Sequence, residues 1–368
     1  MEYPREITVI QAVTILISTI IGVGLLALPL FAVRTADTGA PFVTLMGIVL
    51  ASIGLGLITF LGMRHPRKSI ILYSEDILGK WLGKVWSIAI ILFFAVLTGL
   101  TSREFGAVVI TAILKQTPLE VTVIVMLILA ALSTRNDMNV FAYIHNFYVP
   151  FIIAPALIIV ALSLKNANTL YLLPLLGNDS GNYLVGAFTI AALFQGSFIF
   201  TMIIPFMRYP QKALKASIWG MGIAGGLYLL IVIATVAVFG PGEILNLLWP
   251  TLELARTTSV PGNILQRLDI VFLSVWVIAV FTTLLSSYMF TVHAISQLVG
   301  LRDHKMLSFS ILPIVFIIAM IPQNILHLYD VIEIFGRLGL ILTVGYPMLL
   351  LCVDLIKKKV KKSGSIKA

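Results

Sequence analysis

Long apolar runs alternate with short polar connections along almost the whole chain. About 20 consecutive apolar residues are enough for an α-helix to cross the hydrocarbon core of a bilayer. The pattern therefore predicts an all-α polytopic membrane protein that forms a single membrane domain over residues 1–368. Ten transmembrane helices are expected, at residues 7–33, 40–63, 84–114, 118–134, 139–164, 183–207, 213–239, 268–299, 307–321 and 328–355.

Two of these apolar runs contain residues that form helices poorly. The first run is interrupted by Gly22-Val23-Gly24 and then by Pro29, and the sixth by Gln195-Gly196. A broken helix is tolerated in lipid only where protein or a water-filled cavity satisfies the freed backbone groups. Paired interruptions in corresponding spans are typical of a small-molecule site near the bilayer midplane. We therefore predict that helices 1 and 6 are discontinuous and enclose a binding site.

The positions of the two interruptions predict a five-plus-five inverted repeat. The first five-helix repeat would cover residues 7–164, the second would cover residues 183–355, and a basic cytoplasmic tail would follow at 356–368. Because five is odd, the second repeat enters the membrane from the face opposite to the first. The halves share no convincing residue identity, so the prediction depends on the interruptions and the topology.

The distribution of basic residues predicts the orientation in the membrane. Most of the 25 lysines and arginines fall in alternate connections and in the C-terminal tail. Because cytoplasmic loops carry the excess of basic residues, both termini are expected to be cytoplasmic, with the tail facing anionic lipid. Helices lying on the membrane are expected in two connections, at 74–82 and within 242–267, where the second would cap the outer mouth of the bundle.

The composition excludes several classes of function. Hydrophobic residues make up 59% of the chain and charged residues only 11%, whereas soluble domains carry about 25% charged residues. Cys352 is the single cysteine, which excludes an intramolecular disulfide and a multi-cysteine metal site. No nucleophile–base arrangement, metal cluster or phosphate loop is visible. We therefore expect no enzyme activity, no cofactor and no binding of nucleic acid, despite the formal net charge of +9.

The interruptions also suggest which ligand the site would take. Unwinding at Gly22-Val23-Gly24 would expose N–H groups at the start of a half-helix, where the helix dipole favours a carboxylate. Gln195 and Gly196 would add groups suited to an amino group, so the predicted ligand is a small zwitterion. Alternatively, the glycines are packing notches, and membrane hydroxyls often bond only to their own backbone. The expected walls of the site come from the third and eighth spans: Phe93, Leu97, Thr98, Thr282 and Thr283.

Four ionisable residues lie within predicted spans. Arg103 and Glu104 are in the third span, and Glu333 and Arg337 form an i, i+4 pair in the tenth. A charge at membrane depth costs roughly 2.5–3.5 kcal/mol on insertion scales, so each of these residues needs a partner or water. We predict that the four approach one another as a buried ionic network on the outer side of the pocket. A structural role is the first interpretation, and a gate or a proton path is the alternative.

Several stretches resemble known membrane proteins. The sequence GVGLLALP at 22–29 resembles the first-span motif of the amino acid–polyamine–organocation permeases. The chain as a whole resembles the permease-like B subunit of bacterial spore germinant receptors. The supporting residues are LGKWLG at 78–83, Arg103, LWPT at 248–251 and VWVIAVFTT at 275–283. The resemblance implies a LeuT-like fold and a subunit of a nutrient receptor.

The resemblance also implies a site, a location and partners. The ligand would be a nutrient, often an amino acid, and the protein would work in the spore inner membrane beside a membrane-embedded A subunit and a C-subunit lipoprotein. The pocket residues carried over from the family are Gly22, Val23, Gly24, Phe93, Leu97, Gln195, Gly196 and Thr283.

Three functions follow from these patterns. In the first, the chain is a sensor, in which nutrient binding favours one arrangement of the two repeats and the partner subunit responds to it. Binding can bias such an equilibrium only by its different affinity for the two states. In the second, the chain is a secondary transporter that moves the amino acid by alternating access. In the third, it is a structural or channel-like protein that conducts water or ions without binding a nutrient.

Overall fold

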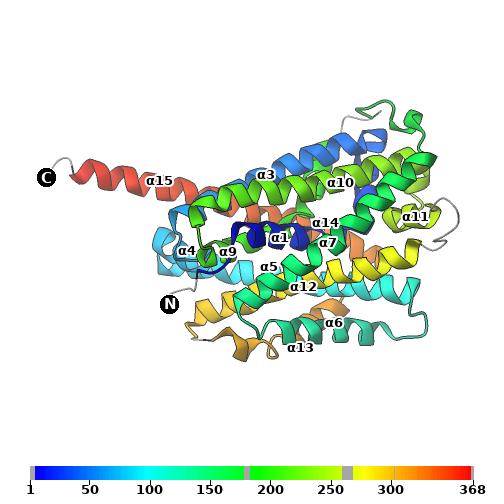
Figure 1. The fold of residues 1–368 in the computed structure, drawn as a ribbon. Coiled ribbons are helices and arrows are strands. Elements are labelled where there is room, and N and C mark those ends of the chain that lie inside the picture. The colour runs from blue at the N-terminus through cyan, green and yellow to red at the C-terminus, as the bar shows by residue number, and fades with distance from the viewer. Residues whose placement is uncertain (1–4, 178–182, 259–267, 302, 366–368) are drawn as a thin grey trace.

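The computed structural model describes residues 5–177, 183–258, 268–301 and 303–365, with side chains up to Lys358. Figure 1 shows long helices gathered side by side into an elongated bundle. The helices are α1 (Val9–Ile20), α2 (Gly24–Ala36), α3 (Ala40–Arg64), α4 (Ile70–Leu78), α5 (Lys80–Ala112), α6 (Leu119–Ser133), α7 (Met138–Ser163), α8 (Tyr183–Ala192), α9 (Phe200–Ile203), α10 (Ala213–Ile244), α11 (Pro250–Thr257), α12 (Leu268–Val299), α13 (Leu312–Met320), α14 (Ile325–Leu340) and α15 (Tyr346–Ser365).

The lengths and apolar character of these helices establish a multi-pass membrane protein. Within the described residues, six helical segments are long and apolar enough to cross a bilayer, and α8 with the segment Gln195–Phe206 makes a seventh, bent by 48°. Two further apolar helices, α1 and α6, are shorter. The number of ten spans therefore stays a prediction.

Helix boundaries agree with the predicted spans in some places and differ in others. The eighth predicted span, 268–299, has the bounds of α12, whereas α13 is much shorter than the predicted ninth span, 307–321. Pro313 lies at the start of α13 and Pro322 follows its end, and proline cannot continue a helix interior. The predicted tenth span, 328–355, contains a π-helical turn at Ile341–Gly345 between α14 and α15. The predicted tail begins inside α15, and residues 366–368 lie outside the described residues.

The start of the chain is fixed by local and long-range bonds. Thr8 and Gln11 form a capping box that begins α1. Just before α1, Ile7 forms two backbone hydrogen bonds with the segment that follows α9. Its N–H donates to the carbonyl of Phe206 at 3.1 Å, and its carbonyl accepts from the N–H of Arg208 at 2.8 Å. The first and sixth predicted spans are therefore joined at one end of the bundle.

Helix packing brings the two halves of the chain together. In Figure 1, α3 and α10 run side by side along the bundle. Helix α3 also packs against α8, and α10 packs against α1, so each half supplies a long helix that supports the interrupted segment of the other half. The centre of the bundle is a continuous core of buried apolar side chains.

Two short helices lie at opposite ends of the bundle. Helix α4 is beside α5 at the end where α15 leaves the bundle, and α11 packs against α2 and α12 at the other end (Figure 1). Thr251 of α11 donates to the carbonyl of Leu25 at 2.7 Å, which fixes α11 over α2. These helices occur in the two connections where the sequence predicted short helices, although residues 259–267 lie outside the described part.

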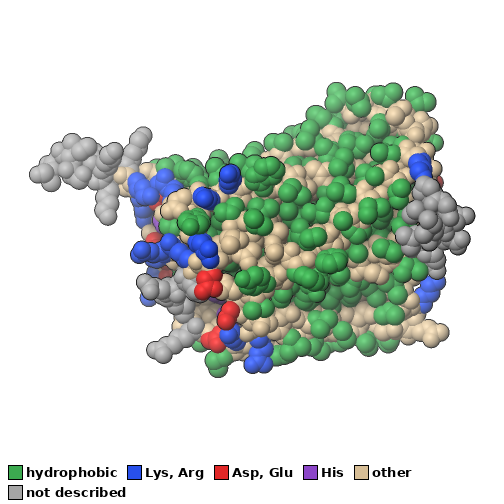
Figure 2. Space-filling model, viewed as in Figure 1, with side chains coloured by type: hydrophobic (Ala, Val, Ile, Leu, Met, Phe, Trp, Pro, Cys, Tyr) green, Lys and Arg blue, Asp and Glu red, His purple; other side chains and the backbone are tan. Residues whose placement is uncertain are grey.

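The surface has the character expected in a bilayer. Figure 2 shows hydrophobic side chains over the length of the bundle, with lysine and arginine gathered mainly at the end that carries α4 and α15. Among the outward apolar side chains are Trp81 (85% exposed) and Ile10 (71%). A surface so rich in large apolar side chains is stable in lipid and not in water.

Candidate functional site

A cavity lies where the two interrupted segments meet. It is lined by residues of α1, α2, α5, α8, η4 (Gln195–Ile199), α12 and α14. The centre of a water-sized sphere can occupy about 80 Å³ inside this cavity. A single water needs roughly 10–15 Å³ by this measure, so the cavity holds several waters or a small organic molecule.

The structure brings seven of the ten predicted ligand-site residues together around this cavity. Those that line it are Gly22, Val23, Gly24, Leu97, Gln195, Gly196 and Thr283. The remaining three, Phe93, Thr98 and Thr282, do not line it. Phe93 stacks behind Phe335, with ring centroids 4.8 Å apart, so it supports the wall. The hydroxyls of Thr98 and Thr282 donate to backbone carbonyls, as the structural interpretation of such residues predicts.

The first interruption is a tight contact between α1–α2 and α12. Helix α1 ends at Ile20 and α2 begins at Gly24. A Cβ atom on Gly22 would collide with the side chain of Thr283, whose hydroxyl donates to the carbonyls of Ser18 and Thr19 at 3.2 and 3.1 Å. Glycine is therefore required at position 22 so that α12 can approach the end of α1 and satisfy its last carbonyls.

The Ile20 carbonyl at this interruption is satisfied by the other half of the chain. The hydroxyl of Tyr228, on α10, donates to it at 2.7 Å. In the first turn of α2, the N–H groups of Leu25 and Leu26 donate to the carbonyls of Gly22 and Val23 at 3.3 and 3.2 Å. The N–H of Gly24, which lines the cavity, has no hydrogen-bond acceptor among the described residues. The N–H of Gly24 is therefore the donor of α2 that is left at this point, and the carboxylate site expected from the sequence stays a prediction.

The second interruption is arranged differently. Helix α8 ends at Ala192, and a 3-10 turn begins at Gln195, whose side-chain Nε2 donates to the carbonyl of Gly336 on α14 at 2.6 Å. The Gln195 Oε1 atom is buried and accepts no bond from the described residues. A Cβ atom on Gly196 would lie 2.9 Å from the carbonyl oxygen of Thr19, so the two interruptions touch through backbone atoms.

A hydrogen-bonded cluster holds α1, α7 and α12 together beneath the cavity. The hydroxyls of Thr19 and Ser286 are 2.7 Å apart, and Ser286 is 2.9 Å from Nε2 of His145. His145 is fully buried, and its Nδ1 is 2.8 Å from the carbonyl of Phe141. Both ring nitrogens are occupied, so His145 acts as a structural link between helices.

The four ionisable residues do not form one network. Glu333 and Arg337 pair within α14, and Thr189 donates to the same Glu333 oxygen at 3.4 Å. Arg103 instead donates to the carbonyl of Pro322 at 2.8 Å. Among the described residues no ion pair joins Arg103 or Glu104 to α14. Glu104 lines the cavity with Glu333, so two of the four belong to the pocket.

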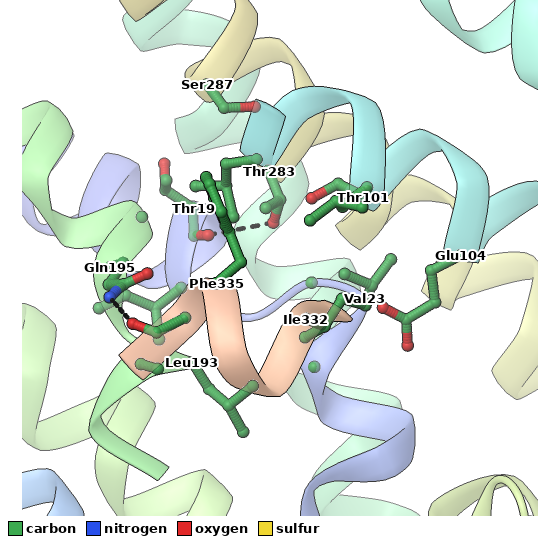
Figure 3. A pocket seen from close by; sticks show the side chains of 18 of the residues that line it. Thr19, Val23, Thr101, Glu104, Leu193, Gln195, Thr283, Ser287, Ile332 and Phe335 are labelled. Carbon is green, nitrogen blue, oxygen red and sulfur yellow. Dashed lines mark hydrogen bonds between the residues drawn. The ribbon is translucent and has the colours of Figure 1, made fainter. Parts of the chain in front are cut away.

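Several lining residues were not predicted from the sequence. They include Thr19, Phe31, Thr101, Ile332 and Phe335. On α5 the face toward the cavity carries Leu97, Thr101 and Glu104, spaced i, i+4 and i+7. The sequence contains this spacing, but the face predicted to line the site was that of Phe93, Leu97 and Thr98. The face that lines the cavity is turned from it about the axis of α5 and shares only Leu97 with it. Figure 3 shows Phe335 and Ile332 of α14 projecting toward the interruptions, an approach of α14 that no local pattern indicated.

Comparison with known proteins identifies relatives over nearly the whole chain. The family described as spore germination protein matches residues 6–327. Spore germination protein YndE of Bacillus subtilis (strain 168) is 26% identical over 358 residues, which cover 97% of this chain and 98% of that protein. Spore germination protein B2 of the same organism is 23% identical over 362 residues and covers 97% of each.

Solved structures of transporters share the fold. Mhp1, a nucleobase-cation-symport-1 family transporter, superposes with a TM-score of 0.69 at 13% identity, over 93% of this chain and 78% of that one. MhsT in complex with L-phenylalanine gives a TM-score of 0.69 at 13% identity, over 95% and 89%. These likenesses support the LeuT-like fold. Since the family match extends over most of its length, this chain belongs to the spore germination protein family of permease-like membrane proteins.

Proposed function

We propose that the chain is the nutrient-sensing membrane subunit of a spore germinant receptor and binds a small amino acid between the interrupted segments. The observation that carries the proposal is the cavity itself, because Gly22, Gly24, Gln195 and Gly196 line one enclosed space. The N–H of Gly24 on one side and the amide oxygen of Gln195 on the other have no hydrogen-bond partner among the described residues, and together they suit a zwitterion. MhsT, which shares the fold, has been solved in complex with L-phenylalanine.

The proposal includes ten spans in two inverted repeats, with helices 1 and 6 discontinuous. In that arrangement α1–α2 corresponds to α8–α9, and α3 to α10. The packing of α3 on α8 and of α10 on α1 supports this correspondence. When each helix is replaced by its counterpart in the other repeat, the α3–α8 contact becomes the α10–α1 contact. Helices α4 and α11 would also correspond, because each follows the second helix of its repeat and they lie at opposite ends of the bundle (Figure 1).

Orientation and assembly complete the proposed function. The gathering of basic side chains at the end that carries α4 and α15 supports cytoplasmic termini. The proposed location is the spore inner membrane, where the chain would act with a membrane-embedded A subunit and a C-subunit lipoprotein. Ligand binding would favour one arrangement of the repeats, and the A subunit would respond to it.

A thermal-shift screen of the purified protein tests the site. The standard L-amino acids, glucose and inosine are the probes, and an amino acid is expected to raise the Tm in proportion to its occupancy. Gly24→Trp should abolish that shift, because even a Cβ at this position lies 3.3 Å from Leu193. Gly56→Trp is the matched control, since a Cβ there meets no atom within 4 Å. An undiminished shift in Gly24→Trp would show that the ligand binds elsewhere.

A secondary transporter is the alternative, favoured by the fold shared with Mhp1 and MhsT. Liposomes that contain only this chain distinguish the two functions. A sensor binds the labelled amino acid that the screen identifies without accumulating it inside the vesicle. Uptake that is lost in Gly24→Trp and kept in Gly56→Trp would instead establish alternating access.

A further inference from the structure

We propose that Glu104 accepts the ammonium group of the ligand, so the site selects compounds with a protonated primary amine. This inference rests on the proposed function, because it concerns the same cavity. It goes further by assigning the chemical group that is recognised and the residue that recognises it.

Glu104 is a buried carboxyl group that forms no ion pair with any of the described residues. Its side chain is 3% exposed, and Oε1 accepts no hydrogen bond from the described residues. The two arginines of the predicted network are engaged elsewhere, since Arg103 donates to the carbonyl of Pro322 and Arg337 pairs with Glu333. A carboxylate in a membrane core needs a positive partner, and an intramembrane acid facing a cavity is a binding-site candidate for that reason.

The position of Glu104 gives it access to a bound molecule. It lines the cavity from α5, one turn beyond Thr101. Figure 3 shows its carboxyl on the side of the pocket near Val23 and Ile332, whereas Gln195 lies on the opposite side. The N–H of Gly24, which follows Val23, has no acceptor among the described residues, so a carboxylate and an ammonium of one small ligand would reach adjacent partners.

The other polar groups of the pocket also call for a ligand that donates hydrogen bonds. The Nε2 atom of Gln195 is held by Gly336, which leaves its Oε1 as a buried acceptor with no partner. The hydroxyls of Thr283 and Ser287 already donate to backbone carbonyls. The pocket therefore offers two open side-chain acceptors, and an unpaired buried acceptor costs free energy that a ligand donor would recover.

The carboxyl of Glu104 is held in place from the outer end of the bundle. The hydroxyl of Tyr329 interacts with it, and Tyr329 in turn accepts a bond from Nε1 of Trp249 at 2.8 Å. Phe31 packs edge-on against the Tyr329 ring, with centroids 5.5 Å apart. Tyr329 and Trp249 are therefore positioning residues, and α11 is connected to the ligand site through them.

The remaining lining is apolar and suits a ligand with a small hydrocarbon side chain. Leu97, Leu100, Ile332 and Phe335 face the same space as Glu104. Pockets of this kind orient a ligand by a few polar groups and bury the rest of it against apolar walls. The ligand class is therefore an apolar amino acid, or the amine related to it.

Matched ligands test this assignment. The amino acid that gives the largest shift in the screen is compared with its decarboxylated amine and its deaminated acid. For L-valine these are isobutylamine and 3-methylbutanoate. The amino acid and, more weakly, the amine should stabilise the wild-type protein, whereas the acid should not. Glu104→Gln should reduce the affinity for the amino acid by about 10-fold or more, as expected when a hydrogen bond to a charged group is lost.

The controls separate a binding effect from a folding effect. Glu104→Asp keeps the charge and should retain the preference for the amine over the acid. Glu243→Gln removes an exposed carboxylate from the end of α10 and should bind as the wild type does. Equal affinity of wild type and Glu104→Gln, or equal affinity for the acid and the amino acid, would overturn the role of Glu104. The absence of any shift in the wild type with every probe would instead overturn the proposed function.

Discussion

Two regions of this molecule are rich in glycine, and they use it in opposite ways. At the interruptions, Gly22 and Gly196 are places of closest contact, because a Cβ atom would collide with Thr283 or with the Thr19 carbonyl. Between α3 and α10, Gly56, Gly222 and Gly226 line a shallow groove of about 350 Å³, and a Cβ at any of the three meets nothing within 4 Å.

The difference shows what each glycine does. The glycines at the interruptions allow backbone segments of the two halves to touch, and this contact shapes the internal pocket. The open glycines of the groove lie on the outer side of the α3–α10 pair, where a methyl group would only replace lipid. Glycine content by itself therefore does not identify a site, and the surroundings of each glycine decide its role.

The largest expected effect is that of Gly22→Ala. The added Cβ collides with the Thr283 side chain, so α12 must move away from the end of α1. We expect a loss of stability of about 1–3 kcal/mol, typical of overpacking, together with loss of the ligand-induced rise in Tm. The measurement is a thermal-shift titration with the amino acid found in the screen. The double variant with Thr283→Ala removes part of the collision and should recover part of the binding, and no recovery would show that this contact is not the cause.

A smaller effect is expected for Gly196→Ala. Its Cβ would lie 2.9 Å from the Thr19 carbonyl oxygen, so a shift of a few tenths of an ångström relieves most of the contact. We expect about 1 kcal/mol of destabilisation and a ligand affinity reduced several-fold but still measurable. Titration in parallel with Gly22→Ala gives the ranking. If the Gly196 variant loses more binding than the Gly22 variant, the second interruption dominates the site.

The smallest effects are expected on α10, where two neighbouring glycines provide a matched pair. A Cβ at Gly225 would lie 2.9 Å from Cγ2 of Ile48, so this one side chain must shift slightly, whereas a Cβ at Gly226 meets no atom within 4 Å. We expect a loss below about 1 kcal/mol for Gly225→Ala and none for Gly226→Ala, with unchanged ligand binding in both. Impaired binding in Gly226→Ala would mean that the groove communicates with the pocket, and the comparison between the two regions would fail.

Much of the fold could be predicted because membrane helices obey simple constraints on length and polarity. Lipid requires every backbone group to be bonded internally, so an apolar run such as 268–299 has few options other than a helix, and α12 has those bounds. The interruptions were predictable for the same reason, since Gly22, Gly24 and Gly196 stand out in runs that otherwise favour helix.

The exact wall of the pocket was not predictable, because it depends on helix rotation and on contacts between distant segments. The predicted face of α5 had Phe93, Leu97 and Thr98, and of these only Leu97 lines the cavity, where it is joined by Thr101 and Glu104. A helix with a hydrophobic majority on all sides shows no clear stripe, so its sequence does not fix which face turns inward. The four residues of the predicted ionic network do not form one unit for a related reason, since the side chain of Arg103 donates to the backbone carbonyls of Pro322 and Gln323.

The sequence alone determined that this chain crosses a membrane many times, that two of its apolar segments are weakened by glycine, and that it resembles spore germinant receptor permeases. These properties follow from composition and local order, which a single segment carries by itself. Only the tertiary structure decided that Glu104 lies beside the pocket with no ion pair to any described residue, and that Tyr329 and Trp249 connect it to α11. These features depend on which side chains surround a buried carboxylate. That set of neighbours is fixed only when residues more than 200 positions apart pack together, as Arg103 and Pro322 do.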